Sequence, residues 1–220
     1  VLAMMLSCAY KYAPNGNITV AVFREGSAVT AVIHGKRSAC VVDLKKGGGA
    51  SGSVVKYLNR NGIYHLEAVI LNADVNTSLP VYSSSLELFD TDTVLVPDED
   101  MYLADGYSSF HTESYSKDGG CVEIGECSIN FFQNGVVAVN CYGENIIMYG
   151  SNTDTVPDIA YSAAVRYSGK AAEADADAEV IAAMDENAEV TAKSGTKVYI
   201  GKNVKFIIDS DGAVYSEEIK

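Results

Sequence analysis

Short apolar segments separated by turn-forming residues dominate the first part of the sequence. Residues 18–23, 27–35 and 38–44 are rich in β-branched side chains, and the "HGKR" between the second and third segments is typical of a hairpin. Three strands on such short connections predict an antiparallel start to a sheet.

The pattern then changes to that of an α/β unit. Residues 53–62 carry one apolar face between a serine N-cap and a closing glycine, which predicts a helix. Residues 66–72 are almost continuously apolar, as in a strand buried on both faces. A helix over residues 80–89 and a strand over 93–97 follow, so we expect a βαβαβ unit and a mixed sheet.

The second half contains the same kinds of segment without a close sequence repeat. We expect strands within 123–133, 135–143, 144–150 and 159–169, a helix over 172–187 from its Ala, Glu and Met content, and hairpins over 197–218. Two halves of this kind predict an α/β (α+β) protein, in which two mixed sheets lie face to face with helices outside. This is a four-layer αββα sandwich.

Length and composition are consistent with one globular domain over residues 15–220. The chain has 220 residues, of which 48% are hydrophobic, so it can bury a full core. Residues 1–14 begin with nine apolar residues, fewer than the about 20 that span a bilayer. We expect this lead segment to be the end of a transmembrane helix or of a signal sequence, or a short core segment.

Charge and cysteine content exclude some classes of partner and site. The formal net charge of −13, without a basic cluster, makes direct nucleic-acid binding unfavourable. The five cysteines contain no CxxC pair, which argues against a cysteine zinc site. Cys40 and Cys141 lie in apolar runs, where we expect buried free thiols.

Several segments resemble a known family. "AVFREGSA" matches the family segment "LDVGQGDA" at Gly26 and Ala28, "VVDLK" keeps Asp43 of "LIDTG", and "YLNRNGIYHLEAVILN" fits a "YLxxxGI" helix that leads into a metal loop. The chain therefore resembles the metallo-β-lactamase-like domain of ComEC-type competence proteins, membrane proteins implicated in DNA uptake. The resemblance extends from about Asn17 to Val214 and implies the metallo-β-lactamase fold.

The metal ligands of that family are mostly absent from the matching positions. The loop "SHPDADH" falls on residues 71–77, the aspartate of "LLTGD" on residue 151, and "HHG" on residues 167–169. The vestigial metal-loop positions are Asn72, Asp74, Asn76, Thr77, Ser151, Tyr167 and Ser168. Asp74 alone keeps a carboxylate, whereas the turn glycines Gly150 and Gly169 remain.

Metal chemistry is disfavoured on physical grounds too. A hydrolytic site needs about three converging ligands from His, Asp, Glu or Cys, and amides and hydroxyls bind transition metals poorly. Nothing in the spacing of His34, His65 and His111 makes them converge. We expect no cofactor and no metal, with zinc or manganese as the alternative, and no catalytic residue; Asp43 and His111 are possible cleft residues.

Three functional hypotheses follow. The first is a catalytically inactive scaffold or binding domain, extracytoplasmic and membrane-associated, whose partner is the membrane region of its parent protein or an unidentified protein or ligand. The second is an active metal-dependent, phosphodiesterase-like hydrolase with a rearranged site drawn from Asp43, Asp74, His111 and Asp154. The third is a secreted binding lobe with the tyrosine-rich loop 102–117 as its contact surface.

Overall fold

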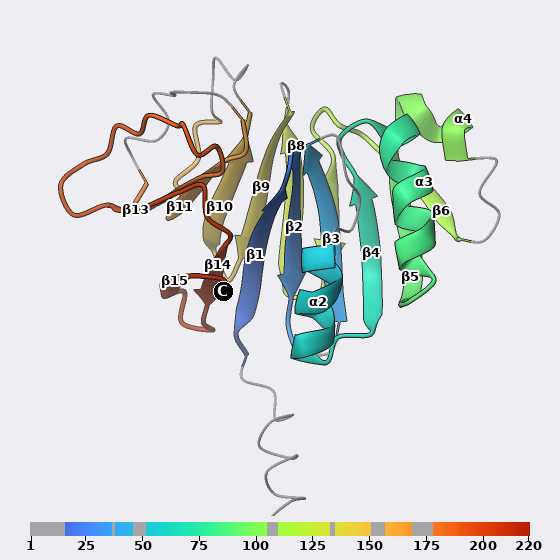
Figure 1. Cartoon of the computed structure of the whole chain (residues 1–220), viewed down its shortest axis with the longest axis horizontal. Helices are drawn as coiled ribbons and strands as arrows, with labels where there is room; N and C mark the ends of the chain where they lie inside the picture. Colours follow the sequence, from blue (N-terminus) through green and yellow to red (C-terminus); the bar gives the residue numbers. More distant parts are fainter. Residues whose placement is uncertain are drawn as a thin grey trace, which may run out of the picture.

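Two mixed β-sheets packed face to face organise the chain (Figure 1). This computed structural model describes residues 16–36, 38–45, 52–104, 110–132, 135–150, 157–168 and 178–220. In these residues sheet A has eight strands in the order β15 (Val214–Glu218), β14 (Val204–Ile208), β1 (Ile18–Glu25), β2 (Ala28–His34), β3 (Ser38–Lys45), β4 (His65–Leu71), β5 (Asp90–Pro97) and β6 (Thr112–Tyr115). Sheet B has seven, in the order β13 (Lys197–Ile200), β12 (Val180–Ala183), β11 (Ala163–Arg166), β10 (Glu144–Tyr149), β9 (Val136–Cys141), β8 (Cys127–Phe132) and β7 (Cys121–Ile124).

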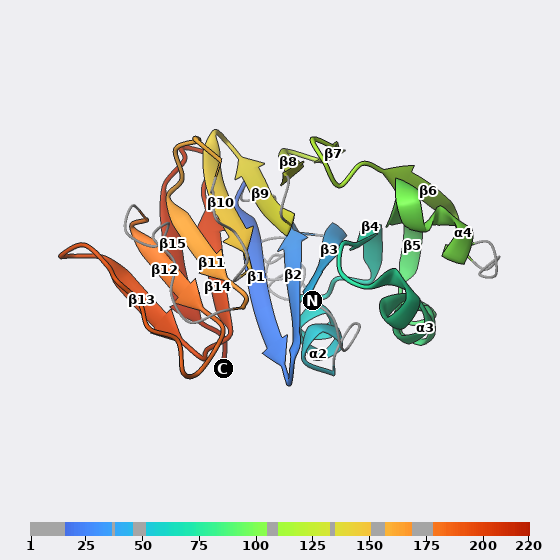
Figure 2. The same cartoon turned by 90° about the horizontal axis from the view of Figure 1, so that it is seen from above.

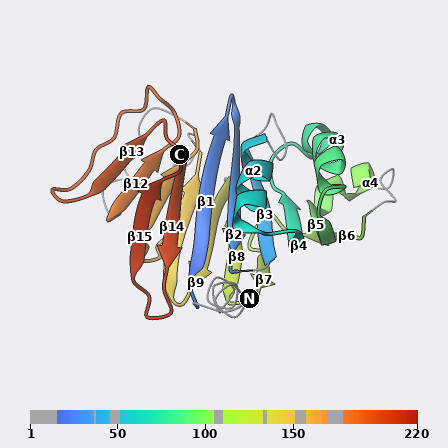
Figure 3. The same ribbon diagram turned by 60° about the horizontal axis from the view of Figure 1, so that its bottom comes forward.

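The described helices cover one sheet. α2 (Gly52–Asn61), α3 (Val75–Leu86), the 3₁₀ turn η1 (Asp98–Asp100) and α4 (Met101–Ala104) lie over the outer face of sheet A, as Figures 2 and 3 show. On the outer face of sheet B, a smaller apolar cluster packs against Ile159, Tyr161 and Val190 from connecting segments. The predicted sandwich of two mixed sheets is confirmed, with its described helices on sheet A.

The central strands of sheet A are apolar on both faces because both faces are covered. In β3, residues 39–44 are all buried. Side chains such as Val41 face the helices, and Cys40 and Val42 face sheet B. β1, β2 and β3 are antiparallel, and β3, β4, β5 and β6 are parallel. The predicted antiparallel start and βαβαβ unit are therefore both present.

Two predicted elements are wrong. Within the expected helix 172–187, residues 180–183 form β12, which lies between β11 and β13, while 171–177 fall outside the described residues. The four apolar residues of β12 are all buried, so tertiary packing overrides the helix propensity of alanine. The expected β13–β14 hairpin is instead a crossover, because β13 pairs with β12 in sheet B and β14 with β1 in sheet A.

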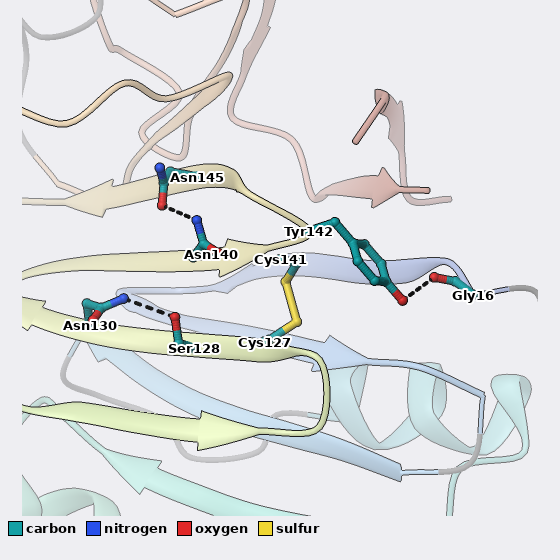
Figure 4. The surroundings of a disulfide bond; sticks show 8 residues. All are labelled: Gly16, Cys127, Ser128, Asn130, Asn140, Cys141, Tyr142 and Asn145. Carbon is teal, nitrogen blue, oxygen red and sulfur yellow. Dashed lines mark hydrogen bonds between the residues drawn. A yellow bond between two sulfur atoms is a disulfide. The ribbon is translucent and has the colours of Figure 1, made fainter. Parts of the chain in front are cut away.

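A disulfide bond joins the strands β8 and β9, which corrects the expectation of a free thiol at Cys141. Cys127 and Cys141 are directly opposed in the antiparallel register, with Cα atoms 4.5 Å apart, and both side chains are buried between the sheets (Figure 4). Next to the bond, the Tyr142 hydroxyl donates to the Gly16 carbonyl at 2.5 Å. Cys40 is a buried free thiol, as predicted.

Removal of this disulfide should destabilise the protein. A bond that closes a loop of this length stabilises by about 3 kcal/mol, so we expect the Cys127→Ala/Cys141→Ala variant to lose roughly that much free energy of unfolding in urea. The control is Cys121→Ser, at an exposed free thiol, which should change it by less than about 0.5 kcal/mol. Thiol titration of denatured protein should reveal one additional pair of thiols after reduction; an unchanged count contradicts the disulfide.

Candidate functional site

A cleft of about 490 Å³ lies where the loop after β4 faces sheet B. Its walls come from that loop, from the turn after β6 and from the adjoining ends of β8 and β9. The lining residues are Asn72, Lys117, Asp118, Phe131, Phe132, Gly135 and Val136. The cleft is therefore at the carboxyl end of a parallel strand, the usual position of ligand sites in sheets with parallel strands, and it includes one of the predicted positions.

Tyr115 contacts two of the lining residues, Asn72 and Phe131, and donates a hydrogen bond to the loop after β4. Its hydroxyl lies 3.1 Å from Asn72 Oδ1 and 3.4 Å from the Leu71 carbonyl oxygen, so it donates to the polar atoms of this loop. Its ring packs on Phe131 of sheet B with centroids 4.5 Å apart. Burial, with the nearby Glu99 carboxylate, raises the pKa of Tyr115 well above its usual range, so the hydroxyl stays a donor.

Tyr167 occupies the second predicted region. Its hydroxyl donates to the Gly135 carbonyl oxygen at 2.8 Å, and burial raises its pKa to about 12. A Cβ atom on Gly150 would lie 3.1 Å from the Tyr167 ring and 2.9 Å from Ser168 Oγ. The glycine thus permits close approach of the Tyr167 and Ser168 side chains. Ser151, which follows Gly150, lies outside the described residues, as does Asp154.

The one carboxylate of the vestigial loop caps a helix. The Asp74 carbonyl accepts from the backbone N–H groups of Thr77 at 3.1 Å and Ser78 at 2.9 Å, and Asp74 Oδ2 accepts from Thr77 Oγ1 at 3.0 Å. Asp74 is therefore at the N-cap of α3, where a carboxylate is favoured by the helix dipole. Asn76 is exposed in the first turn of that helix.

Asp43 lies beneath α3 and does not line the cleft. Its side chain is fully buried, and its Oδ2 accepts a hydrogen bond from the Ser78 hydroxyl on the inner face of the helix. Burial raises the pKa of Asp43 to about 6, the Ser78 hydrogen bond opposes this rise, and the negative charge of Asp74 adds to it. Asp43 lies opposite Leu71 in the register of β3 and β4, so it is next to the start of the cleft loop without lining the cleft.

The three histidines lie apart from one another and from the cleft. His34 binds the Tyr57 hydroxyl at 2.8 Å, under α2. His65, at the start of β4, lies 3.4 Å from Asp90 and 3.3 Å from Asp92. His111 lies beside Val94 in the middle of β5 and contacts Glu113 at 2.8 Å, so the structure does not bring it to the cleft.

No sequence pattern singled out Lys117 and Asp118 as cleft residues, or Tyr115 as their neighbour. Tyr115 and Lys117 belong to the tyrosine-rich loop 102–117, in which the structure places the strand β6, and Asp118 follows directly. Lys117 pairs with Glu99 at 3.3 Å and Asp100 at 3.6 Å. In the described part of the chain, no group of three or more His, Cys, Asp or Glu side chains is placed to share a metal ion.

Comparisons with known proteins support the fold. No protein-family model matches the sequence, and no curated protein matches it. Among solved structures, zinc-bound PqqB from Methylobacterium extorquens is similar over 70% of this chain and 71% of its own, with a TM-score of 0.51 and 10% identity. A diphosphatase of the PhnP family aligns over 92% of this chain and 98% of its own, with a TM-score of 0.46 and 9% identity. The chain has the metallo-β-lactamase fold.

Removing the Tyr115 hydroxyl should leave the acceptors of the cleft loop without their buried donor. We expect Tyr115→Phe to lower the free energy of unfolding by about 1 kcal/mol. The matched control is Tyr215→Phe at an exposed tyrosine on β15, which should change it by less than about 0.5 kcal/mol. Denaturant titration of both variants measures the difference. Equal stability of the two variants would contradict the hydrogen bonds assigned to the Tyr115 hydroxyl.

Asp43 should make the stability of the fold depend on pH. Its pKa is raised from 3.8 to about 6 on folding, so stability is greatest below the unfolded value and falls as the pH rises through the folded one. The loss amounts to about 3 kcal/mol between about pH 3.5 and pH 8.

The comparison with Asp43→Asn isolates this contribution, because the other titrating groups are common to both proteins. Unfolding is measured in tetramethylammonium buffers, whose cation is too large to enter the interior and neutralise the carboxylate. As the pH rises, the wild type should lose free energy of unfolding relative to Asp43→Asn. A stability difference that does not change with pH would refute the raised pKa of Asp43.

Proposed function

We propose that this chain is a non-catalytic member of the metallo-β-lactamase fold, acting as a scaffold or binding domain of a ComEC-type membrane protein linked to DNA uptake. The observation that carries the proposal is the state of the vestigial metal loop. Its polar groups bond to one another and to tyrosines: Asp74 caps α3 and Asn72 accepts from Tyr115. A loop so satisfied is stable without a metal ion.

The chemistry of the cleft supports binding better than hydrolysis. A metal-activated water needs a cation held by about three anionic or imidazole ligands. The cleft wall instead offers one carboxylate, Asp118, and the cation of Lys117 beside the amide of Asn72. An apolar wall of Phe131, Phe132 and Val136 with a few polar groups suits the side chain of a protein partner or a small ligand with an apolar body.

An extracytoplasmic location is part of the proposal. The buried disulfide between β8 and β9 supports it, because such bonds persist in oxidising compartments and are rare in the cytosol. None of the helices in the described residues is long and apolar enough to cross a membrane. We therefore assign the membrane association to the parent protein, whose membrane region is the first partner to consider.

The net negative charge of the chain argues against direct DNA binding. With a formal net charge of −13, the chain repels a phosphate backbone, so it would not bind DNA directly. In this proposal its contribution to DNA uptake is through contact with protein.

Metal analysis separates the proposed binding domain from a metal-dependent hydrolase. The purified chain is incubated with zinc or manganese, desalted and measured by mass spectrometry, together with phosphodiester hydrolysis of bis(p-nitrophenyl) phosphate. We expect far less than one metal per chain and no turnover above the buffer rate. One tightly held metal per chain, with turnover, would overturn the proposal in favour of the phosphodiesterase-like alternative.

The variant Asp74→Ser tests whether the Asp74 carboxylate is a metal ligand. Serine is a favoured N-cap residue that removes the carboxylate, and the main-chain carbonyl of residue 74 still accepts the first hydrogen bonds of α3, so stability should change little. In the proposed binding domain, wild type and variant give the same low metal content. A metal that is bound by the wild type and lost in Asp74→Ser identifies Asp74 as a ligand and supports the hydrolase.

A further inference from the structure

A cluster of buried oxygen atoms lies between α3 and sheet A. Among the described residues, four polar or charged side chains are buried, and three of them, Thr30, Asp43 and Ser78, belong to this cluster. Thr30 and Asp43 are paired across β2 and β3, and Ser78 binds Asp43 from α3. Tyr82, one helical turn after Ser78, is also fully buried. Three of the four buried polar or charged side chains of the described residues are therefore at one place.

Two of these oxygen atoms have no partner. Asp43 Oδ1 and the Tyr82 hydroxyl are inaccessible to solvent and make no hydrogen bond. The Thr30 side chain acts on Tyr82 as a hydrogen-bonding neighbour and lowers its pKa, although the two make no hydrogen bond within normal geometric limits. An unsatisfied buried polar group is costly, and a half-satisfied carboxylate more so, which calls for a further occupant.

The charge in the cluster is also uncompensated. Asp43 is the one carboxylate in the cluster of Thr30, Asp43, Ser78 and Tyr82. The other charge that acts on it is that of Asp74, which is also negative. Tyr82 stays a neutral hydroxyl, because burial raises its pKa well above its usual range. A buried anion that meets only neutral oxygen atoms and a second anion is costly, and a bound counter-charge would relieve that cost above the pKa of Asp43.

We propose that this cluster binds an alkali cation, Na⁺ or K⁺, with Asp43 Oδ1 as its charged ligand and the Tyr82 hydroxyl oxygen as a neutral one. The hydroxyls of Thr30 and Ser78 lie beside these two and are the further oxygen atoms available to it. Hard cations take oxygen ligands, whereas divalent cations favour several carboxylates, and transition metals favour imidazole or thiolate. One carboxylate among neutral hydroxyls matches a single positive charge.

Such an ion has a structural consequence for the cleft. It would join β2 and β3 to the inner face of α3, and α3 starts at Asp74 in the loop that borders the cleft. The ion would therefore fix the position of that loop from below. The site is separate from the vestigial metal loop, so its presence does not depend on the proposed function.

Thermal unfolding in different chloride salts tests the site. At equal ionic strength and about pH 8, we expect Na⁺ or K⁺ to raise the Tm of the wild type by about 2–4 °C relative to tetramethylammonium. Asp43→Asn should abolish this difference and Tyr82→Phe should reduce it. Asp211→Asn, at an exposed hairpin residue, is the control and should retain the full difference.

A crystallographic experiment identifies the occupant directly. Crystals soaked in rubidium or thallium salts should show an anomalous peak within bonding distance of Asp43 Oδ1, absent in Asp43→Asn. Equal Tm values in all salts, or a salt effect that survives in Asp43→Asn, overturns the proposal. Water-like density without an anomalous peak also overturns it, because the cluster then holds an internal water molecule.

Discussion

Burial of the central strands of sheet A on both faces is the constraint on which the rest of the structure depends. Helices α2 and α3 cover one face and sheet B covers the other, so the middles of β1, β2, β3 and β4 contain almost only apolar side chains. Polar groups can then occur at strand ends, at sheet edges, or in the interior with partners. The cleft follows from this, because it forms where β4 ends and the two sheets separate.

The same constraint explains how the fold persists without most of the metal ligands of the family it resembles. Ligands at a strand end would hold a loop in place through the ion. Here Tyr115 reaches the loop after β4 from β6, and its ring rests on Phe131 of the opposite sheet. Asp74 holds the other end of the loop at the start of α3. Hydrogen bonds and an aromatic contact between the sheets thus hold this loop.

Two internal features distinguish the two apolar layers of the protein. The disulfide fixes β8 to β9 in the apolar layer between the sheets. It joins the strand ends that are farthest from the paired residues Phe132 and Val136. The oxygen cluster under α3 lies in the other apolar layer, between sheet A and its helices. The disulfide lowers the entropy of the unfolded chain, whereas the oxygen cluster leaves a buried carboxylate only partly satisfied by hydrogen bonds.

Local pattern in the sequence determined most of the strands, the helix before β4 and the mixed sheets, because alternation, apolar runs and caps are properties of neighbouring residues. It also located the loop at Asn72 and Asp74, since a polar segment after a buried strand is visible in the chain itself. Tertiary structure decided the rest. Val180–Ala183 became a strand because β11 and β13 flank it, and Cys127 met Cys141 because β8 and β9 pair in that register. Tyr115 reached Asn72, and Asp43 was enclosed by α3, through contacts between residues more than thirty positions apart, which no local pattern encodes.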